Sequence, residues 1–326
     1  MDRPGLRGTL TVLVLAAFGA AHAFDLQGHR GARGLAPENT LPAFAAALSL
    51  GVTTLELDTA VTKDGVVVVS HEPMPHPDTA RGPDGTWLTA PGPMISAQTY
   101  AELLQYDVGR LNPASAYGKR YPQQVPVDGT RIPQLADVWA LVEKSGNRAV
   151  RFNIETKIDP RAPLATLPPE AFARALIRVI RAGGMASRAS IQSFDWRTLK
   201  VVQAEAPEIP TVYLTAQQSW FNSFDAAGTW TTAGVLYQTH GSAPKMVKAA
   251  GGKTWSPYFA DVDAGNLAEA RALGIAVVAW TVNAPADIAR MMDLGVDGII
   301  SDRPDLVRTE MQKRGMPLPA PTPVVH

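Results

Sequence analysis

The sequence of 326 residues contains no cysteine. Disulfide bonds, thiolate nucleophiles and cysteine-ligated zinc are therefore excluded, and any metal must be held by oxygen or histidine ligands. Neither sign of charge is in excess, because 30 basic and 30 acidic side chains give a formal net charge of zero. Nucleic acid is bound largely through excess positive charge, so we expect no nucleic-acid partner.

Long apolar runs are also missing. The run at residues 10–20 is shorter than the roughly 20 residues that span a bilayer, and it lies between a basic start and a small-x-small motif at residues 21–23. This arrangement is typical of a secretory signal peptide. We predict a signal peptide over residues 1–23, cleaved near Ala23/Phe24, and a periplasmic or secreted protein without stable membrane insertion after cleavage. An uncleaved membrane anchor is the alternative.

Short apolar runs alternate with amphipathic stretches from Phe24 onward, which is typical of βα units and a parallel sheet. No G-x-G-x-x-G follows the first run, so the sequence gives no support for a dinucleotide site. Eight runs predict a single α/β domain over residues 24–313, a (β/α)8 TIM-like barrel with an inserted segment after the second strand. The predicted strands are Phe24–His29, Val52–Asp58, Ala149–Glu155, Ala189–Ser193, Pro210–Thr215, Thr254–Pro257, Ile275–Thr281 and Asp297–Ser301. The clearest helical patterns are Asn39–Leu50, Pro169–Ala182, Ala264–Leu273 and Ala284–Leu294, of which the first and the last two are followed by Gly51, Gly274 and Gly295.

Two segments depart from this plain pattern. Lys63-Asp64-Gly65 lies between alternating apolar residues and predicts a hairpin turn. The Pro-rich and Gly-rich stretch 72–131 has little periodicity apart from a short helix predicted within 96–105. We interpret it as an insertion over the barrel mouth, because long irregular segments in compact domains are usually functional; an idle surface loop is the alternative. Residues 314–326 are rich in proline and predict a frayed tail.

Acidic side chains follow two neighbouring strands of the predicted barrel. Glu56 and Asp58 are two residues apart on one strand, so both carboxylates point to the same face. Glu155, near the end of the next barrel strand, can converge on them. Three adjacent carboxylates repel one another unless a cation neutralises them, and oxygen ligands suit one Mg²⁺ or Ca²⁺. A solvated strand face would be the better interpretation for an isolated E-x-D.

Two histidines occur at matching positions, His29 after the first strand and His71 after the predicted hairpin. Imidazole titrates near neutral pH, so one histidine of a pair can accept a proton while the other donates one. We predict that these two form an acid–base pair. The remaining histidines, His22, His76, His240 and His326, lack such a setting and are predicted to be structural.

Two cationic side chains, Arg30 and Lys157, flank the predicted metal site. Transfer of a phosphoryl group depends mainly on positioning and on charge stabilisation. Together with a divalent ion, these side chains could hold the single negative charge of a phosphodiester. The alternative is that they only form ion pairs with acids such as Glu38, which we expect to orient Arg30.

The ordered set of motifs resembles the glycerophosphodiester phosphodiesterase family over nearly the whole mature chain. The motifs are His29-Arg30-Gly31 with Pro37-Glu38-Asn39-Thr40, Glu56-x-Asp58 with Thr62-Lys63-Asp64-Gly65 and His71, Glu155-x-Lys157, Gln192-Ser193-Phe194-Asp195, Trp280-Thr281-Val282-Asn283, and the closing Gly295-Val296-Asp297-Gly298-Ile299-Ile300-Ser301-Asp302-x-Pro304. Many relatives have an aspartate where this chain has Glu72, and a glutamate there could still orient His71.

The resemblance implies a TIM-like barrel that hydrolyses small glycerophosphodiesters to sn-glycerol 3-phosphate and an alcohol. By position it places a Ca²⁺ or Mg²⁺ ion on Glu56, Asp58 and Glu155, with His29 and His71 as the general acid–base pair. It places Arg30 and Lys157 on the phosphate, and it places Phe194 and Trp280 at the glycerol end of the pocket, where core packing is the alternative. The attacking group could be water or the glycerol 2-hydroxyl, which would give a cyclic phosphate first.

Two other functions fit the sequence less well. A lysophospholipase D-type phosphodiesterase would need an apolar groove for a lipid substrate, and the insertion contains few long apolar runs. A non-enzymatic extracytoplasmic ligand-binding protein would not need paired histidines at strand ends. The alcohol group, the choice between Ca²⁺ and Mg²⁺ and the oligomeric state stay open at this stage.

Overall fold

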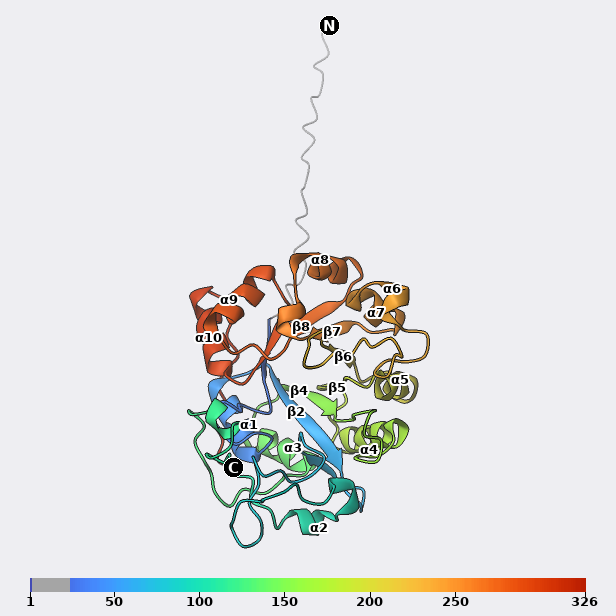
Figure 1. The fold of residues 1–326 in the computed structure, drawn as a ribbon. Helices are drawn as coiled ribbons and strands as arrows, with labels where there is room; N and C mark the ends of the chain where they lie inside the picture. The colour runs from blue at the N-terminus through green and yellow to red at the C-terminus, as the bar shows by residue number, and fades with distance from the viewer. Residues whose placement is uncertain (2–23) are drawn as a thin grey trace.

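The computed structural model describes residues 1 and 24–326 and shows a closed barrel surrounded by helices (Figure 1). The predicted signal peptide lies outside the described residues. Eight parallel strands form the barrel, since β1 pairs with β9 on one side and with β2 on the other. They are β1 (Asp25–Gly28), β2 (Thr54–Val61), β4 (Arg151–Thr156), β5 (Ala189–Ser193), β6 (Thr211–Thr215), β7 (Thr254–Pro257), β8 (Ala276–Ala279) and β9 (Gly298–Ser301). The predicted (β/α)8 fold is confirmed.

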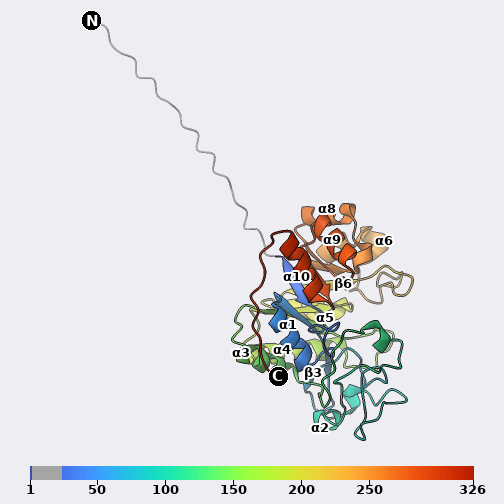
Figure 2. The same ribbon diagram turned by 90° about the vertical axis from the view of Figure 1, so that its left-hand side faces the viewer.

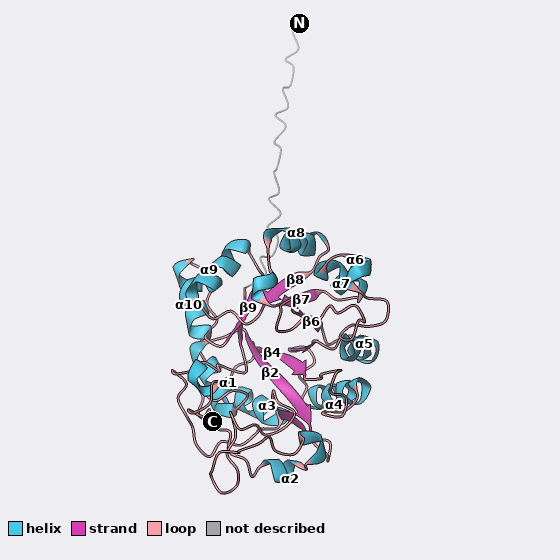
Figure 3. Cartoon of the chain, in the orientation of Figure 1, coloured by secondary structure: helices cyan, strands magenta, loops and turns pink. Residues whose placement is uncertain are grey.

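Helices cover the outside of the barrel, as the colouring by secondary structure shows (Figure 3). The main ones are α1 (Leu41–Leu50), α3 (Leu135–Lys144), α4 (Pro169–Ala182), α5 (Trp196–Glu205), α7 (Ala243–Ala249), α8 (Ala264–Ala272), α9 (Pro285–Leu294) and α10 (Pro304–Lys313). Short helices are α2 (Tyr100–Leu103) and α6 (Tyr237–His240), with 3₁₀ turns at η1 (Ile95–Ala97), η2 (Gly118–Arg120) and η3 (Phe259–Asp261). No helix in the described part of the chain combines the length and the apolar character needed to cross a membrane.

Helix ends follow local sequence signals. The side chain of Thr40 accepts a hydrogen bond from the backbone N–H of Ala43 and caps the start of α1. A threonine oxygen in this position satisfies one of the free N–H groups of the first turn. Gly295 adopts a left-handed conformation with φ 80° after α9. Glycine adopts this conformation without strain. Helix α9 therefore ends at Leu294, as the sequence predicts.

The sharp turn after β2 is the predicted hairpin. Strand β3 (Val67–Val69) pairs antiparallel with the end of β2, and Gly65 in the turn has φ 81°. After β3 the chain enters the irregular segment that contains η1, α2 and η2. In the side view this segment lies beside the barrel and next to α1 and β3 (Figure 2). It reaches the β1–α1 loop, where Gln124 Nε2 donates to the carbonyl oxygen of Arg33 over 2.8 Å.

The C-terminal residues do not form the frayed tail that the sequence suggested. The backbone N–H of Thr322 donates to the carbonyl oxygen of Leu48 at the end of α1. Arg308 on α10 donates to the carbonyl oxygen of Pro319 over 2.7 Å. Met316 and Val324 pack against the hydrophobic core. Proline favours extended backbone. An extended segment can lie along the barrel surface when hydrogen bonds and apolar contacts hold it there.

The β1–α1 loop is packed so closely that Gly31→Ala should destabilise the protein by about 2–4 kcal/mol. Gly31 has φ 84°, and a Cβ atom there would lie 2.6 Å from the backbone carbonyl carbon of Ala43. Gly65→Ala is the matched control, because Gly65 has φ 81° with no atom within 4 Å of the added Cβ. It should cost only about 1–2 kcal/mol of backbone strain. Urea unfolding of both variants measures the difference, and equal losses would contradict the close packing.

Candidate active site

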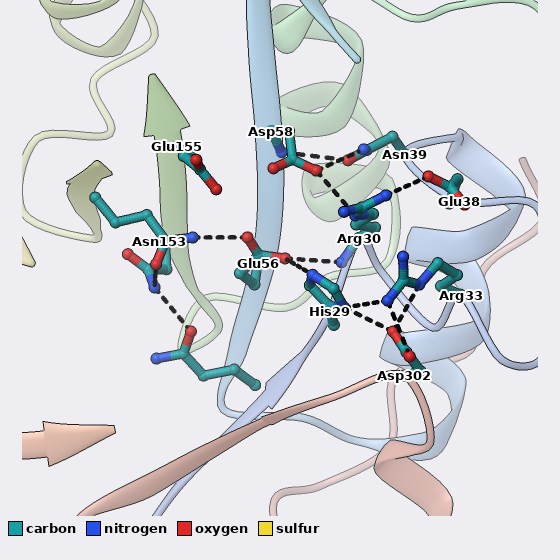
Figure 4. A network of polar contacts seen from close by, with 12 residues as sticks. His29, Arg30, Arg33, Glu38, Asn39, Glu56, Asp58, Asn153, Glu155 and Asp302 are labelled. Atoms are coloured by element: carbon teal, nitrogen blue, oxygen red, sulfur yellow. Dashed lines mark hydrogen bonds and ion pairs between the residues drawn. The ribbon is translucent and has the colours of Figure 1, made fainter. Parts of the chain in front are cut away.

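Strand register brings the three predicted acidic ligands together at the C-terminal mouth of the barrel. Asp58 on β2 is directly opposite Glu155 on β4, and Glu56 is opposite Asn153. Side chains two residues apart on a strand share a face, so all three carboxylates point into the barrel. Their nearest oxygens all lie within 4.8 Å of one another, and all three side chains are buried. Figure 4 shows them facing the same space.

Ionisation of all three carboxylates of this acidic triad is electrostatically unfavourable. Burial, followed by the charge of Asp58, raises the pKa of Glu56 well above its usual value. Burial likewise raises the pKa of Glu155 to about 7 despite the nearby Lys157. Burial alone would raise the pKa of Asp58 too, but Arg30 and other positive groups outweigh it and hold the pKa well below its usual range. A divalent cation bound by these oxygens would relieve the repulsion, and the all-oxygen donor set fits Mg²⁺ or Ca²⁺.

Polar side chains beneath the triad fix Glu56. Gln192 on β5 donates from Nε2 to Glu56 Oε1 over 2.6 Å, and the backbone N–H of Arg30 donates to Oε2 over 2.8 Å. Asn153 donates to Gln192 Oε1 and to Gln27 Oε1 from the barrel floor. Gln192 occurs in the sequence motifs. Its contact with Glu56 could not be predicted from the sequence, because the contact depends on how the strands are arranged in the barrel.

His29 is held by a carboxylate from the far end of the chain. Its Nδ1 lies 2.6 Å from Asp302 Oδ1, and Arg33 also binds Asp302 from Nε and Nη2 at 2.7 and 3.0 Å. Arg33 and His29 outweigh the effect of burial and keep the pKa of Asp302 well below its usual range. A carboxylate is only an acceptor, so Nδ1 carries the proton, and Nε2 is directed toward Glu56 Oε2 at 3.9 Å.

His71 has a parallel arrangement. Its Nδ1 lies 2.7 Å from Glu72 Oε1, so this glutamate is placed to orient the imidazole. That hydrogen bond lowers the pKa of Glu72 to about 2. Burial lowers the pKa of His71, and burial with the charge of Arg33 lowers the pKa of His29 to about 4. Both imidazoles line one cavity of about 160 Å³ with Glu56 and Glu155.

The predicted cations also line this cavity and are already held by acids. Arg30 Nη1 lies 2.5 Å from Glu38 Oε1, and its Nε lies 3.1 Å from Asp58 Oδ2. Lys157 Nζ lies 3.0 Å from Glu155 Oε1. The expected orientation of Arg30 by Glu38 is therefore present (Figure 4). Whether Arg30 and Lys157 also bind phosphate stays a prediction. Phe194 and Trp280 line the same cavity, with ring centroids 5.3 Å apart.

Four polar residues near these cations were assigned no role from the sequence: Arg33, Asn39, Tyr117 and Asp302. Asn39 donates from Nδ2 to Asp58 Oδ2 over 2.9 Å. Tyr117, from the segment between β3 and α3, donates to Glu38 and accepts from Arg33 Nη1 at 2.9 Å. Asn39 and Asp302 occur in recognisable motifs, whereas Tyr117 and Arg33 had no signal beyond their residue types. The segment thus contributes directly to the site, although its boundaries stay a prediction.

Without divalent cations, the folding stability of the wild type should fall relative to that of Glu155→Gln as the pH rises from about 5 to 7. Protonated Glu155 stabilises the fold fully below its usual pKa of 4.5, and this contribution is lost as the pH passes through its folded value of about 7. Thermal unfolding in a chelating agent would measure the slope, and added Mg²⁺ or Ca²⁺ should remove it and raise the unfolding midpoint. Glu155→Gln is the reference, because His29, whose pKa is lowered to about 4, titrates in both proteins and makes stability rise over the same pH range. Parallel pH profiles of the two chelated proteins would contradict this account.

Comparison with known proteins matches the sequence and the fold to one group of enzymes. The family model described as "Glycerophosphoryl diester phosphodiesterase family" matches residues 29–306. A glycerophosphodiester phosphodiesterase of Caldanaerobacter subterraneus is 27% identical, with 88% of this chain and 97% of that protein covered. One of Bacillus subtilis is 26% identical, covering 85% and 83%.

Solved structures agree with this result. A crystal structure from Silicibacter pomeroyi, whose name places it among the glycerophosphoryl diester phosphodiesterases, is 36% identical with a TM-score of 0.81 and covers 91% of this chain and 96% of that one. An Oleispira antarctica phosphodiesterase in complex with the product sn-glycerol-3-phosphate shares the fold at 22% identity and a TM-score of 0.63, covering 88% and 96%. The chain belongs to the glycerophosphoryl diester phosphodiesterase family.

Proposed function

We propose that this enzyme hydrolyses glycerophosphodiesters in a metal-dependent reaction in which His29 and His71 act as the acid–base pair. Family membership supports the reaction class, with sn-glycerol 3-phosphate and an alcohol as products. The observation that carries the finer assignment is a cluster of three buried carboxylates, two of which line one cavity together with both imidazoles. The solved relative that holds sn-glycerol-3-phosphate supports the same product.

The charge balance supports a divalent cation. Six carboxylates surround three cationic side chains, a formal excess of three negative charges if all are ionised: Glu38, Glu56, Asp58, Glu72, Glu155 and Asp302 against Arg30, Arg33 and Lys157. An anionic phosphodiester would be repelled from such a site. Glu56, Asp58 and Glu155 would hold Mg²⁺ or Ca²⁺, which supplies positive charge and polarises a phosphate oxygen when bound.

The side chains of the enzyme hold the phosphate in place and transfer protons. Arg30 and Lys157 bind the non-bridging phosphate oxygens, each kept in place by its acidic partner. Both imidazoles bind a carboxylate through Nδ1, which leaves each Nε2 for proton transfer. One histidine accepts the proton of the attacking oxygen, and the other donates a proton to the oxygen of the departing alcohol. The bond from phosphorus to that oxygen breaks, so one water is consumed for each diester.

Replacing either histidine should lower the release of sn-glycerol 3-phosphate from glycerophosphocholine by about 10²–10⁴-fold. A coupled assay with and without Mg²⁺ and Ca²⁺ measures this for His29→Ala and His71→Ala. His240→Ala is a matched control at a half-buried position on α6 and should retain full activity. Asp302→Asn should also slow turnover. The amide of asparagine can donate a hydrogen bond to Nδ1 of His29, and this favours the tautomer that carries its proton on Nε2. Wild-type rates in both alanine variants would refute the assignment.

We also propose that the chain is exported and that the mature enzyme is periplasmic or secreted. The basic start, short apolar run and small-x-small motif of residues 1–23 support this. Strand β1 begins at Asp25, so cleavage near Ala23 would leave the first strand of the barrel intact. Mass spectrometry of the protein from the cell envelope or medium should give an N-terminus at or near Phe24. A full-length product in the cytoplasm would contradict the proposal.

A further inference from the structure

A second hollow continues outward from the catalytic cavity and is much larger than it. The inner cavity has a volume of about 160 Å³, whereas this groove has about 500 Å³. The two share His71, Glu155, Lys157, Phe194 and Trp280 as lining residues. A diester with a bare glycerol and a small alcohol leaves most of this additional volume unused. The groove is therefore available for a larger substituent on the substrate.

One wall of the groove, here called the aromatic wall, is formed by Phe194, Trp220, Phe221, Trp230 and Trp280. Phe194 packs on Trp280 and Phe221, with ring centroids 5.3 and 5.1 Å apart, and Phe221 packs on Trp230 at 4.9 Å. The wall thus leads without interruption from the catalytic cavity to Trp220, which is 60% exposed. Met74, Met94 and Ile158 add further apolar surface.

The charges in the groove disfavour a cationic occupant. Arg161 lies over the rings of Trp230 and Phe221, with its central carbon 5.1 and 5.8 Å from their centroids. Asp159 binds the Arg161 side chain through both carboxylate oxygens. A quaternary ammonium group would find these aromatic faces occupied by a guanidinium and the neighbouring acid already paired. A neutral apolar chain meets no such repulsion, and it gains from covering aromatic surface.

The rim of the groove has a second unusual feature. Leu164 is 90% exposed, and it belongs to the loop between β4 and α4 whose neighbours Ala162 and Ala165 line the groove. Trp220 is exposed on the loop between β6 and α6. Both loops that contribute to the groove therefore expose one large apolar side chain. Exposed apolar side chains of this kind suit a ligand that arrives from a micelle or a membrane surface.

We propose that the groove binds an acyl or alkyl chain carried on the glycerol end of the substrate, so that monoacyl glycerophosphodiesters are substrates. This inference rests on the proposed function and on the placement of the glycerol beside Phe194 and Trp280. It takes up the lysophospholipase D-type alternative, because the apolar groove that this reaction needs is formed mainly by the loops after β4 and β6 rather than by the insertion. Water is added across the bond from phosphorus to the head-group oxygen. The products are a monoacylglycerol phosphate and the head-group alcohol, and the ester of the chain stays intact.

The test compares glycerophosphocholine with monoacyl glycerophosphocholines of six to ten acyl carbons, assayed below their critical micelle concentrations by release of choline. For the wild type, KM should fall by roughly two- to fourfold for each added methylene that the groove buries. In Trp220→Ala, the ratio of kcat/KM on the ten-carbon substrate to that on glycerophosphocholine should fall about tenfold. Leu164→Ala should lower the same ratio by a smaller factor.

Leu318→Ala is the matched control for Leu164→Ala, because Leu318 is 38% exposed beside Pro319, at the opposite end of the barrel near Gly51. It should leave the ratio unchanged. Turnover of glycerophosphocholine with no turnover of the acyl substrates, or a KM independent of chain length, would overturn the groove assignment and leave the proposed function standing. An equal loss on both substrates in Trp220→Ala would place the head group in the groove and also overturn it. Lack of activity on every diester would instead refute the proposed function.

Discussion

The repulsion among three buried carboxylates is the constraint on which the site depends. Asp58 and Glu155 are opposite each other in the ladder between β2 and β4, and Glu56 lies one pleat below on the same face. Burial and mutual charge raise the pKa of two of them, so the apo site is strained electrostatically. The barrel backbone holds the acids close regardless, because their separation is set by strand register. A divalent cation held by these oxygens would relieve the repulsion.

Two carboxylate–histidine pairs determine which imidazole nitrogen is available in the cavity. Asp302 holds the Nδ1 of His29, and Glu72 holds the Nδ1 of His71. The two pairs are built in different ways, since Asp302 comes from the end of β9 and Glu72 is the next residue in the chain. Both leave Nε2 as the free nitrogen. Arg33 supports one pair by binding Asp302. Arg33 also donates a hydrogen bond to the hydroxyl of Tyr117, which comes from the segment after β3.

The inner site and the outer groove are built from different parts of the barrel. Strand ends supply the acids, the histidines and the lysine. The loops between β4 and α4 and between β6 and α6 supply Arg161, Trp220, Phe221 and Trp230, which shape the outer groove. Because these loops bear few backbone constraints of the barrel, their side chains can change without disturbing strand register. Substitutions in these loops can therefore change the outer part of the groove, although its inner end shares Glu155 and Lys157 with the catalytic cavity.

The sequence alone determined the barrel and the inner site. Apolar runs and helix stops located eight strands to within a few residues, and polar residues at strand ends identified the acids and both histidines, because strand periodicity fixes which face a side chain takes. Only the tertiary structure decided the contacts between distant segments. The pairing of His29 with Asp302, the reach of Tyr117 to Glu38, the packing of the C-terminal tail and the aromatic wall depend on barrel closure and loop paths, which no local periodicity encodes.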